Sequence, residues 1–400
     1  MLLFLTKISF FLFLFCIPIS TRILVHDQNS YDLGFFNEFS SFYVFLPEIL
    51  LIISLFFLGL TFLKNPKLIP KKNLLFESFL LFSILSLPAL IFAKDKMLAF
   101  LWIFRFLELS SLCLFFSPRI MPKKKFWLIL GVSISVQVFI GLLQFILGRS
   151  LGLDLLGEFQ FFYGQKGVAV LDFSFGKIPR AYGTFSHPNA LGAICVLFFL
   201  VFFHVQKSKN MRALRRFLPI FLLGVFISFS RSAALALFIP SLLLLFYERK
   251  NKKKKILFIA LCVALTVFIV RYFESGFSLD NESFSERVNL IQPYTETYLG
   301  YPLGIGGGNS TLFLGEKEAL NFWQINPIHN IFLLALVEFG MLSFLVFISI
   351  FNKLILFSKR NPSVRIAILS IAITGFFDHF WLTCFSASVF MYLVMYRFSK

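Results

Sequence analysis

The chain has 400 residues, of which 58% are apolar and 60 are phenylalanine, whereas only 14% are charged. A soluble domain carries about a quarter charged residues, so this composition excludes an ordinary soluble protein and makes lipid the solvent for most of the chain. The net charge of +18 does not indicate a nucleic-acid partner, because Lys and Arg fall in short loops between apolar runs.

In chain order, apolar runs of about 20 residues recur, which is the length that crosses a bilayer core. They predict an all-α, polytopic membrane helix bundle of about 12 transmembrane helices, with residues 1–400 as a single integral membrane domain. No small-residue cleavage site follows the first run, so we interpret it as a span rather than a signal peptide. The predicted spans are 2–20, 39–63, 74–93, 98–117, 126–148, 187–205, 217–229, 232–247, 256–272, 329–352, 363–377 and 380–397.

Basic residues set the expected orientation, because cytoplasmic loops carry the excess of Lys and Arg. With both termini cytoplasmic, every basic loop falls on the inner side and most acidic residues fall outside. The basic loops are 64–73, 118–125, 206–216, 248–255 and 353–362.

The run 217–247 is too long for one comfortable span. A single span would place the following basic cluster outside, so we predict two short spans that meet near Arg231. Charge within an apolar run is costly and usually functional, and guanidinium matches phosphate with paired donors. The alternative is an arginine that only snorkels to the interface.

Two long polar segments, 149–185 and 273–328, are predicted outer loops, the second carrying part of an active site. Arg180 lies near the end of the first loop, and Ser186 or His187 then caps a helix with Pro188 at its first position. A cation beside a helix N-terminus is a good anion site. The alternative role for Arg180 is anchoring at headgroup phosphates.

His329 and Asn330 open the span 329–352, where an imidazole stays reachable by water and substrate. Imidazole titrates near neutral pH, so His329 could act as a general base, although an interfacial histidine can also be purely structural. Gly340 would let a neighbouring helix or lipid chain come close. The Gly-rich segment 302–309 lacks the nucleotide P-loop pattern and favours a flexible turn.

Other polar and sulfur-containing residues suggest structural roles. Arg105 and Glu108 have helical i, i+3 spacing, which predicts an intramembrane ion pair; Glu77 has no assigned role. The five cysteines lie in apolar runs without C-x-x-C spacing, so neither a disulfide framework nor a metal site is predicted.

The polar motifs resemble those of the O-antigen ligase and polymerase superfamily of bacterial envelope enzymes. They are Arg180-x-x-Gly-Thr-Phe-x-His187-Pro-Asn189-x-Leu-Gly, Ser-Arg231-Ser-Ala, and His329-Asn330 followed by nine residues and Gly340. The resemblance covers residues 180–345 and implies a GT-C-like membrane glycosyltransferase that uses no metal and no cofactor.

The resemblance also implies transfer of a glycan from undecaprenyl diphosphate to an acceptor hydroxyl at the outer face of the bacterial plasma membrane. His329 would be the catalytic base, and Arg180, Arg231 and Arg287 would bind the diphosphate. Supporting residues would be Asn330, Gly340, His187 and Asn189. The acceptor could be a glycan, a lipid or a protein, which leaves ligase, polymerase and protein O-oligosaccharyltransferase open. A transporter or flippase of lipid-linked sugar is the alternative from another class, but it would call for charges deep along a path and for paired broken helices.

Overall fold

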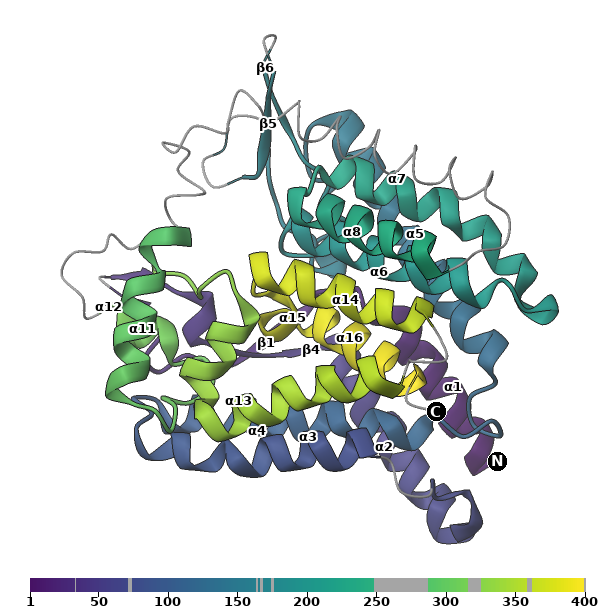
Figure 1. The fold of residues 1–400 in the computed structure, drawn as a ribbon, viewed down its shortest axis with the longest axis horizontal. Coiled ribbons are helices and arrows are strands. Elements are labelled where there is room, and N and C mark those ends of the chain that lie inside the picture. The colour runs from purple at the N-terminus through teal and green to yellow at the C-terminus, as the bar shows by residue number, and fades with distance from the viewer. Residues whose placement is uncertain are drawn as a thin grey trace.

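The computed structural model describes residues 1–32, 34–70, 74–162, 165, 168–173, 176–247, 287–315, 325–357 and 362–398. Helices dominate, with three small antiparallel strand pairs between them: β1 with β4, β2 with β3, and β5 with β6 (Figure 1). The α-helices are α1 Leu2–Cys16, α2 Leu46–Lys64, α3 Leu74–Leu85, α4 Lys96–Ser111, α5 Lys123–Leu147, α6 Pro188–Val205, α7 Leu218–Ser228, α8 Arg231–Tyr247, α11 Ile291–Gly300, α12 Ser310–Gly315, α13 Ile331–Phe357, α14 Pro362–Phe377, α15 Phe380–Thr383 and α16 Phe385–Phe398.

The strands and 3-10 helices lie in the connections. The strands are β1 Arg22–His26, β2 Tyr31–Asp32, β3 Phe35–Phe36, β4 Phe42–Phe45, β5 Val170–Phe173 and β6 Gly176–Pro179. The 3-10 helices are η1 Glu38–Ser40, η2 Pro66–Leu68, η3 Leu87–Ile91, η4 Leu112–Phe115, η5 Asp154–Leu156 and η6 Lys209–Phe217.

The predicted all-α, multi-span membrane architecture is confirmed. Five described helices are long and apolar enough to cross a membrane: Leu46–Lys64, Lys96–Phe115, Lys123–Leu147, Pro188–Val205 and Ile331–Leu356. Shorter apolar helices cover Leu2–Cys16, Leu75–Ile91, Arg231–Leu243 and Arg365–Phe377. The predicted span 256–272 lies outside the described residues, as do residues 273–286 and 316–324 of the predicted outer loop 273–328. The N- and C-terminal ends lie near each other in Figure 1, and their cytoplasmic location stays a prediction.

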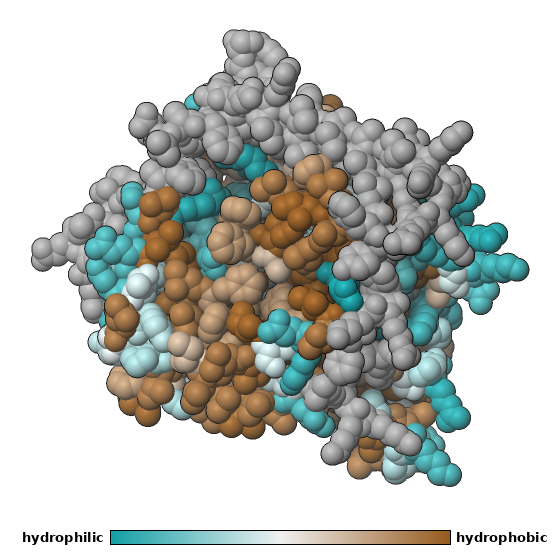
Figure 2. All heavy atoms as spheres, viewed as in Figure 1, coloured by the Kyte–Doolittle hydropathy of each residue, from teal (hydrophilic) through white to brown (hydrophobic). Residues whose placement is uncertain are grey.

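Helix α6 forms the centre of the bundle. Its residues from Pro188 to Phe202 are all buried, and it packs against α7, α8 and α14. On the outside the pattern reverses, because large apolar side chains such as Phe56, Phe139 and Ile146 are more than 60% exposed. Figure 2 shows such side chains over the middle of one face, with hydrophilic residues gathered toward its left and right margins. An apolar exterior of this kind suits lipid as the surrounding solvent.

The predicted start of the span 39–63 and the predicted end of the span 2–20 are wrong. The span 39–63 loses its first residues to η1 and β4, because the aromatic and β-branched segment 42–45 pairs with β1. Helix α2 starts only at Leu46, with Pro47 in its first turn and the Glu48 carboxylate accepting the Phe45 N–H at 3.1 Å. The span 2–20 likewise stops at Cys16, before β1.

The predicted division of 217–247 is confirmed. Helix α7 ends at Ser228 and α8 begins at Arg231, with Phe229 in the left-handed region at φ 45°. Gly192 of α6 makes room for this break, since a Cβ there would lie 2.5 Å from Ser228 Oγ. The break therefore sits directly against the central helix.

Helix α13 is also interrupted, at Gly340, where φ is 78° and ψ is 170°. The Gly-rich segment 302–309 packs its backbone against this interruption. Its N–H groups at Ile305 and Gly306 donate to the carbonyls of Val337 and Glu338, at 3.1 and 2.8 Å. Met341 N–H donates in return to Pro302 O at 3.0 Å. The predicted turn is therefore present, and it is hydrogen-bonded to α13. The partner that approaches Gly340 is this turn rather than the predicted helix or lipid chain.

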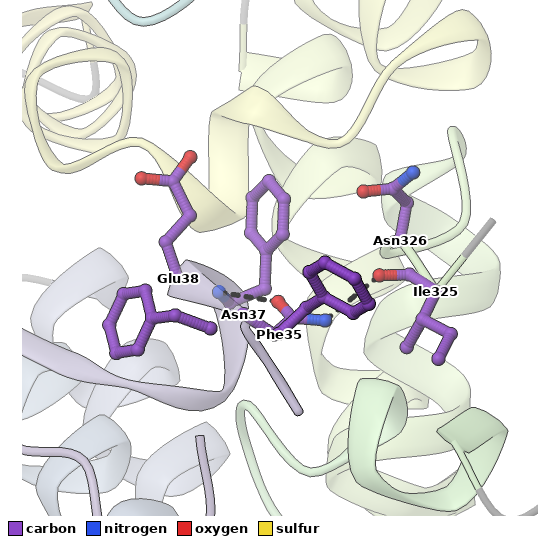
Figure 3. A pocket seen from close by; sticks show the side chains of 7 residues that line it. Phe35, Asn37, Glu38, Ile325 and Asn326 are labelled. Atoms are coloured by element: carbon purple, nitrogen blue, oxygen red, sulfur yellow. Dashed lines mark hydrogen bonds between the residues drawn. The ribbon is translucent and has the colours of Figure 1, made fainter. Parts of the chain in front are cut away.

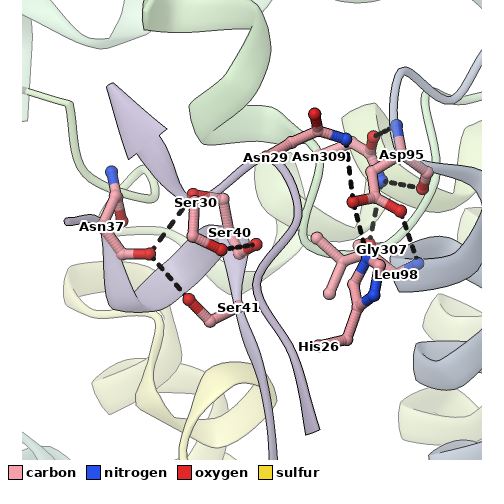
Figure 4. A network of polar contacts seen from close by, with 10 residues as sticks. All are labelled: His26, Asn29, Ser30, Asn37, Ser40, Ser41, Asp95, Leu98, Gly307 and Asn309. Carbon is pink, nitrogen blue, oxygen red and sulfur yellow. Dashed lines mark hydrogen bonds and ion pairs between the residues drawn. The ribbon is translucent and has the colours of Figure 1, made fainter. Parts of the chain in front are cut away.

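Asn309 fixes the same turn to the start of α4 (Figure 4). Its side-chain oxygen accepts the Asp95 N–H at 2.8 Å, and its nitrogen donates to Asp95 O at 3.1 Å. The Asp95 carboxylate caps α4 through the Leu98 N–H and lies 2.7 Å from His26 Nε2 of β1. Burial alone would raise the pKa of Asp95, but these hydrogen bonds and one from Asn29 outweigh it and lower the pKa.

Candidate active site

The helix N-terminus predicted at His187 is confirmed. Helix α6 begins at Pro188, and His187 Nδ1 accepts the N–H of Asn189 at 3.1 Å. Burial lowers the pKa of His187 to about 3, so the ring is neutral at physiological pH. A neutral ring with Nδ1 as acceptor is a helix cap, which leaves His187 poorly suited to a base.

Arg180 is oriented by this helix start and by the break between α7 and α8. Its Nε donates to Ser228 O at 2.7 Å, and its Nη2 donates to Asn189 Oδ1 at 2.7 Å. Burial lowers the pKa of Arg180 to about 10, and the nearby charges of Arg231 and Arg287 act in the same direction. The guanidinium is still a cation at neutral pH, with its position set by two neutral acceptors.

Asn189 continues the chain of polar contacts to Asp378, at the turn between α14 and α15. Asn189 Nδ2 donates to Asp378 Oδ2 at 2.8 Å, and the His379 N–H donates to Asp378 Oδ1 at 2.8 Å. Burial would raise the pKa of Asp378, but His329 and the surrounding histidines and arginines hold it well below its usual range. Asp378 is therefore a buried anion in a cluster of cations and imidazoles.

His329 lies beside this anion. Its Nδ1 is 3.6 Å from Asp378 Oδ1, and that nitrogen is buried with no hydrogen-bond partner among the described residues. The His329 side chain is 24% exposed, whereas that of Asp378 is 7% exposed. One ring nitrogen thus faces a carboxylate while the side chain remains accessible, which is the arrangement of an oriented base.

Asn330 has a simpler part in this region. Its side-chain oxygen accepts the N–H groups of Phe332 and Leu333, at 2.9 and 3.0 Å. It is the cap of α13, and it fixes the direction in which the preceding His329 leaves the helix.

Arg231 and Arg287 complete the charge cluster. Arg231 is the first residue of α8, and its charge and that of Arg287 lie close enough to repel each other and to act on Arg180. Arg287 also acts on His187 and His379. Like charges at a helix N-terminus oppose the helix dipole, so a bound anion would relieve both effects.

The structure accordingly brings together all four predicted catalytic and diphosphate-binding residues, His329, Arg180, Arg231 and Arg287. Gly340 is not part of this cluster, because it packs against the turn at 302–309. Two contributors were not predicted: Asp378, whose only signal was an Asp-His pair between two apolar runs, and the Ser228 carbonyl, which no side-chain pattern marks.

His329, Asp378 and His379 also form a group that could hold a metal ion. Each offers one ligand atom, and these atoms lie within 4.8 Å of one another. His379 Nδ1 is 2.7 Å from Thr383 Oγ1, and burial lowers the pKa of His379 to about 3. The predicted independence of metal therefore needs a direct test at these three residues.

The predicted Arg105–Glu108 ion pair is replaced by a contact between helices. Arg105 Nε and Nη2 donate to the two carboxylate oxygens of Glu48 in α2, at 3.1 and 2.9 Å, and both side chains are buried. A bidentate pair gains more from its geometry than an i, i+3 pair on one helix, so the interhelical partner prevails.

Comparison with known proteins gives one family. The family model described as O-antigen ligase matches residues 216–348, a range that contains Arg231, Arg287, His329 and Gly340. No curated protein matches the chain.

Proposed function

We propose that this chain, whose residues 216–348 match the O-antigen ligase family model, transfers a glycan from undecaprenyl diphosphate to an acceptor hydroxyl. The proposed location is the outer face of the bacterial plasma membrane, with both termini in the cytoplasm. The observation that carries the proposal is the continuous chain of contacts from His329 through Asp378 and Asn189 to Arg180. It couples a base to a cation within one site.

In the proposed reaction, His329 Nε2 takes the proton from the acceptor hydroxyl as its oxygen attacks the anomeric carbon of the donor sugar. The bond from that carbon to the diphosphate breaks, and the diphosphate leaves with the electron pair. The resulting imidazolium lies beside the anionic Asp378, which stabilises it.

The three arginines supply the positive charge that the departing diphosphate needs. Arg180 is held by Ser228 and Asn189, so its guanidinium requires little reorganisation when the anion forms. Diphosphate is a good leaving group once it is neutralised, and therefore no general acid and no metal ion enter the proposed mechanism.

The experiment is transfer by purified protein in vesicles that contain a lipid-linked glycan and a candidate acceptor. His329→Ala should bind the donor lipid but lose about 10²–10⁴-fold in turnover, the usual contribution of a general base. His204→Gln, at the opposite end of α6, is the matched histidine control. Near-normal turnover in His329→Ala would refute the assignment, and the mass of the product separates ligase, polymerase and protein transfer.

A further inference from the structure

A pocket with a volume of about 230 Å³ lies next to the candidate active site (Figure 3). One wall is the outer segment between β1 and α2, with Phe35, Asn37 and Glu38, and the other holds Ile325 and Asn326, just before His329. The volume is below the ~300–1,000 Å³ of drug-sized ligand sites, so it suits one small ring rather than an extended chain.

The pocket is connected to the proposed base through ring contacts. Phe39 belongs to its lining and packs edge-on against His379, with 5.3 Å between the ring centroids. His379 in turn lies 5.1 Å from the His329 ring. The Phe39 and His379 rings therefore lie between the pocket and His329, so a ligand in the pocket is close to the base without touching it.

The walls are fixed before any ligand binds. Asn37 Nδ2 donates to Ile325 O at 2.9 Å, which joins the two walls, and Asn37 Oδ1 accepts the Phe39 N–H at 3.0 Å (Figure 3). Ser40 and Ser41 hydroxyls donate to Asn37 O at 3.3 and 3.0 Å (Figure 4). Because these side chains are already ordered, a ligand that binds here causes little further loss of conformational entropy.

The chemistry of the lining differs from that of the arginine cluster. Three phenylalanines, two amides and one carboxylate line the pocket, and no cation is among these seven residues. Glu38 is already neutralised by Arg22, at 2.7 Å. The seven lining residues offer a diphosphate no positive charge, and the neighbouring Arg22 is already paired with Glu38. A sugar ring, in contrast, offers an apolar C–H face to aromatic rings and hydroxyls to amide and carboxylate groups.

We propose that this pocket binds a sugar of the acceptor glycan next to the one that reacts, and so holds the reacting hydroxyl close to His329. The inference rests on the proposed function, because it divides that site into a diphosphate half with the arginines and an acceptor half with Phe35, Phe39, Glu38 and Asn326. Phe35 and Phe36 are 51% and 42% exposed, so the stacking surface is open to an incoming glycan.

The kinetic test uses Phe35→Ala, which removes an exposed ring without opening the core. The KM for the acceptor should rise about 3- to 10-fold, the range of a lost aromatic contact, while kcat and the KM for the lipid-linked donor stay unchanged. Phe35→Trp should restore the acceptor KM. The control is Phe162→Ala, an outer-loop ring that is 64% exposed and lies outside the pocket. An unchanged acceptor KM in Phe35→Ala, or an equal rise in both KM values, would overturn the proposal.

A binding test separates this proposal from the proposed function. Saturation-transfer NMR is recorded on the protein in a detergent without a sugar headgroup, with methyl glycosides of common hexoses as probes. Binding that is lost in Phe35→Ala and kept in Phe162→Ala supports a sugar site even if no transfer is detected. Absence of binding to the wild-type protein, or binding that survives Phe35→Ala, overturns it.

Discussion

Replacing Gly340 by alanine tests the contact between the broken helix α13 and the turn at 302–309. A Cβ at this position would lie 2.3 Å from Leu303 O and 2.4 Å from Leu303 C, both backbone atoms that cannot rotate away. The φ of 78° with ψ of 170° is a region essentially limited to glycine, and forcing another residue into it costs about 1–3 kcal/mol.

The clash can be relieved only if the turn moves. Movement breaks the three backbone hydrogen bonds that join it to α13, from Ile305, Gly306 and Met341. Each contributes about 0.5–1.5 kcal/mol net. Strain and lost hydrogen bonds together predict a destabilisation of about 2.5–7.5 kcal/mol for Gly340→Ala.

The assay is thermal unfolding of the detergent-purified variants, with Gly59→Ala as the matched control. Gly59 lies within α2, and no atom is within 4 Å of a Cβ built there, so alanine should be neutral or should stabilise by up to about 1 kcal/mol. We expect a clearly lower Tm for Gly340→Ala than for Gly59→Ala. Equal Tm values for the two variants would refute the reasoning about this contact.

Four further predictions concern the site and its orientation. Arg231→Lys should fold normally but lose most transfer activity, because lysine lacks the paired donors of arginine. The control Arg216→Lys, in the exposed η6, should keep its transfer activity. Equal activities of the two variants would mean that Arg231 only anchors its helix. EDTA should leave transfer unchanged, and activity that is lost and then restored by a divalent ion would assign His329, Asp378 and His379 to a metal. The folded protein lowers the pKa of His187 and of His379 to about 3, so below pH ~6.5 these two histidines bind protons in the unfolded chain but not in the folded one. Tm should therefore fall as pH decreases from about 6.5 toward 3. A Tm that stays constant over this range would contradict the assignment of both rings as neutral. Cysteines introduced singly at positions 165 and 300 should react with an outside reagent and those at 122 and 252 should not, and labelling at 252 would contradict the proposed topology.

Features that depend on neighbouring residues could be predicted from the sequence. The helix start at His187 and Pro188 follows from local capping, and the break before Arg231 follows from the charge of the next loop. Contacts between distant segments could not be predicted in the same way. Arg105 had Glu108 nearby in sequence, yet it pairs with Glu48, and Gly340 meets a turn that no helical periodicity connects to it.

Asp378 illustrates the same limit inside the candidate site. Its place between two apolar runs marked it as unusual, but only the fold shows that Asn189 and His329 both approach it. The aromatic pocket was equally hidden, because its two walls come from residues 35–39 and 325–326. Local patterns therefore predicted which residues carry charge, and long-range packing decided which of them meet.

The Asn189–Asp378 hydrogen bond also has a consequence for the order in which the protein is made. The two residues are 189 positions apart, and Asp378 lies close to the end of the 400-residue chain. At about 5–20 residues per second, a ribosome reaches Asp378 some ~10–40 s after Asn189. During that interval the Arg180 cation is already synthesised, but the nearby Asp378 anion is not. A chain that stops before α14 therefore inserts most of its helices yet cannot assemble the centre that they surround.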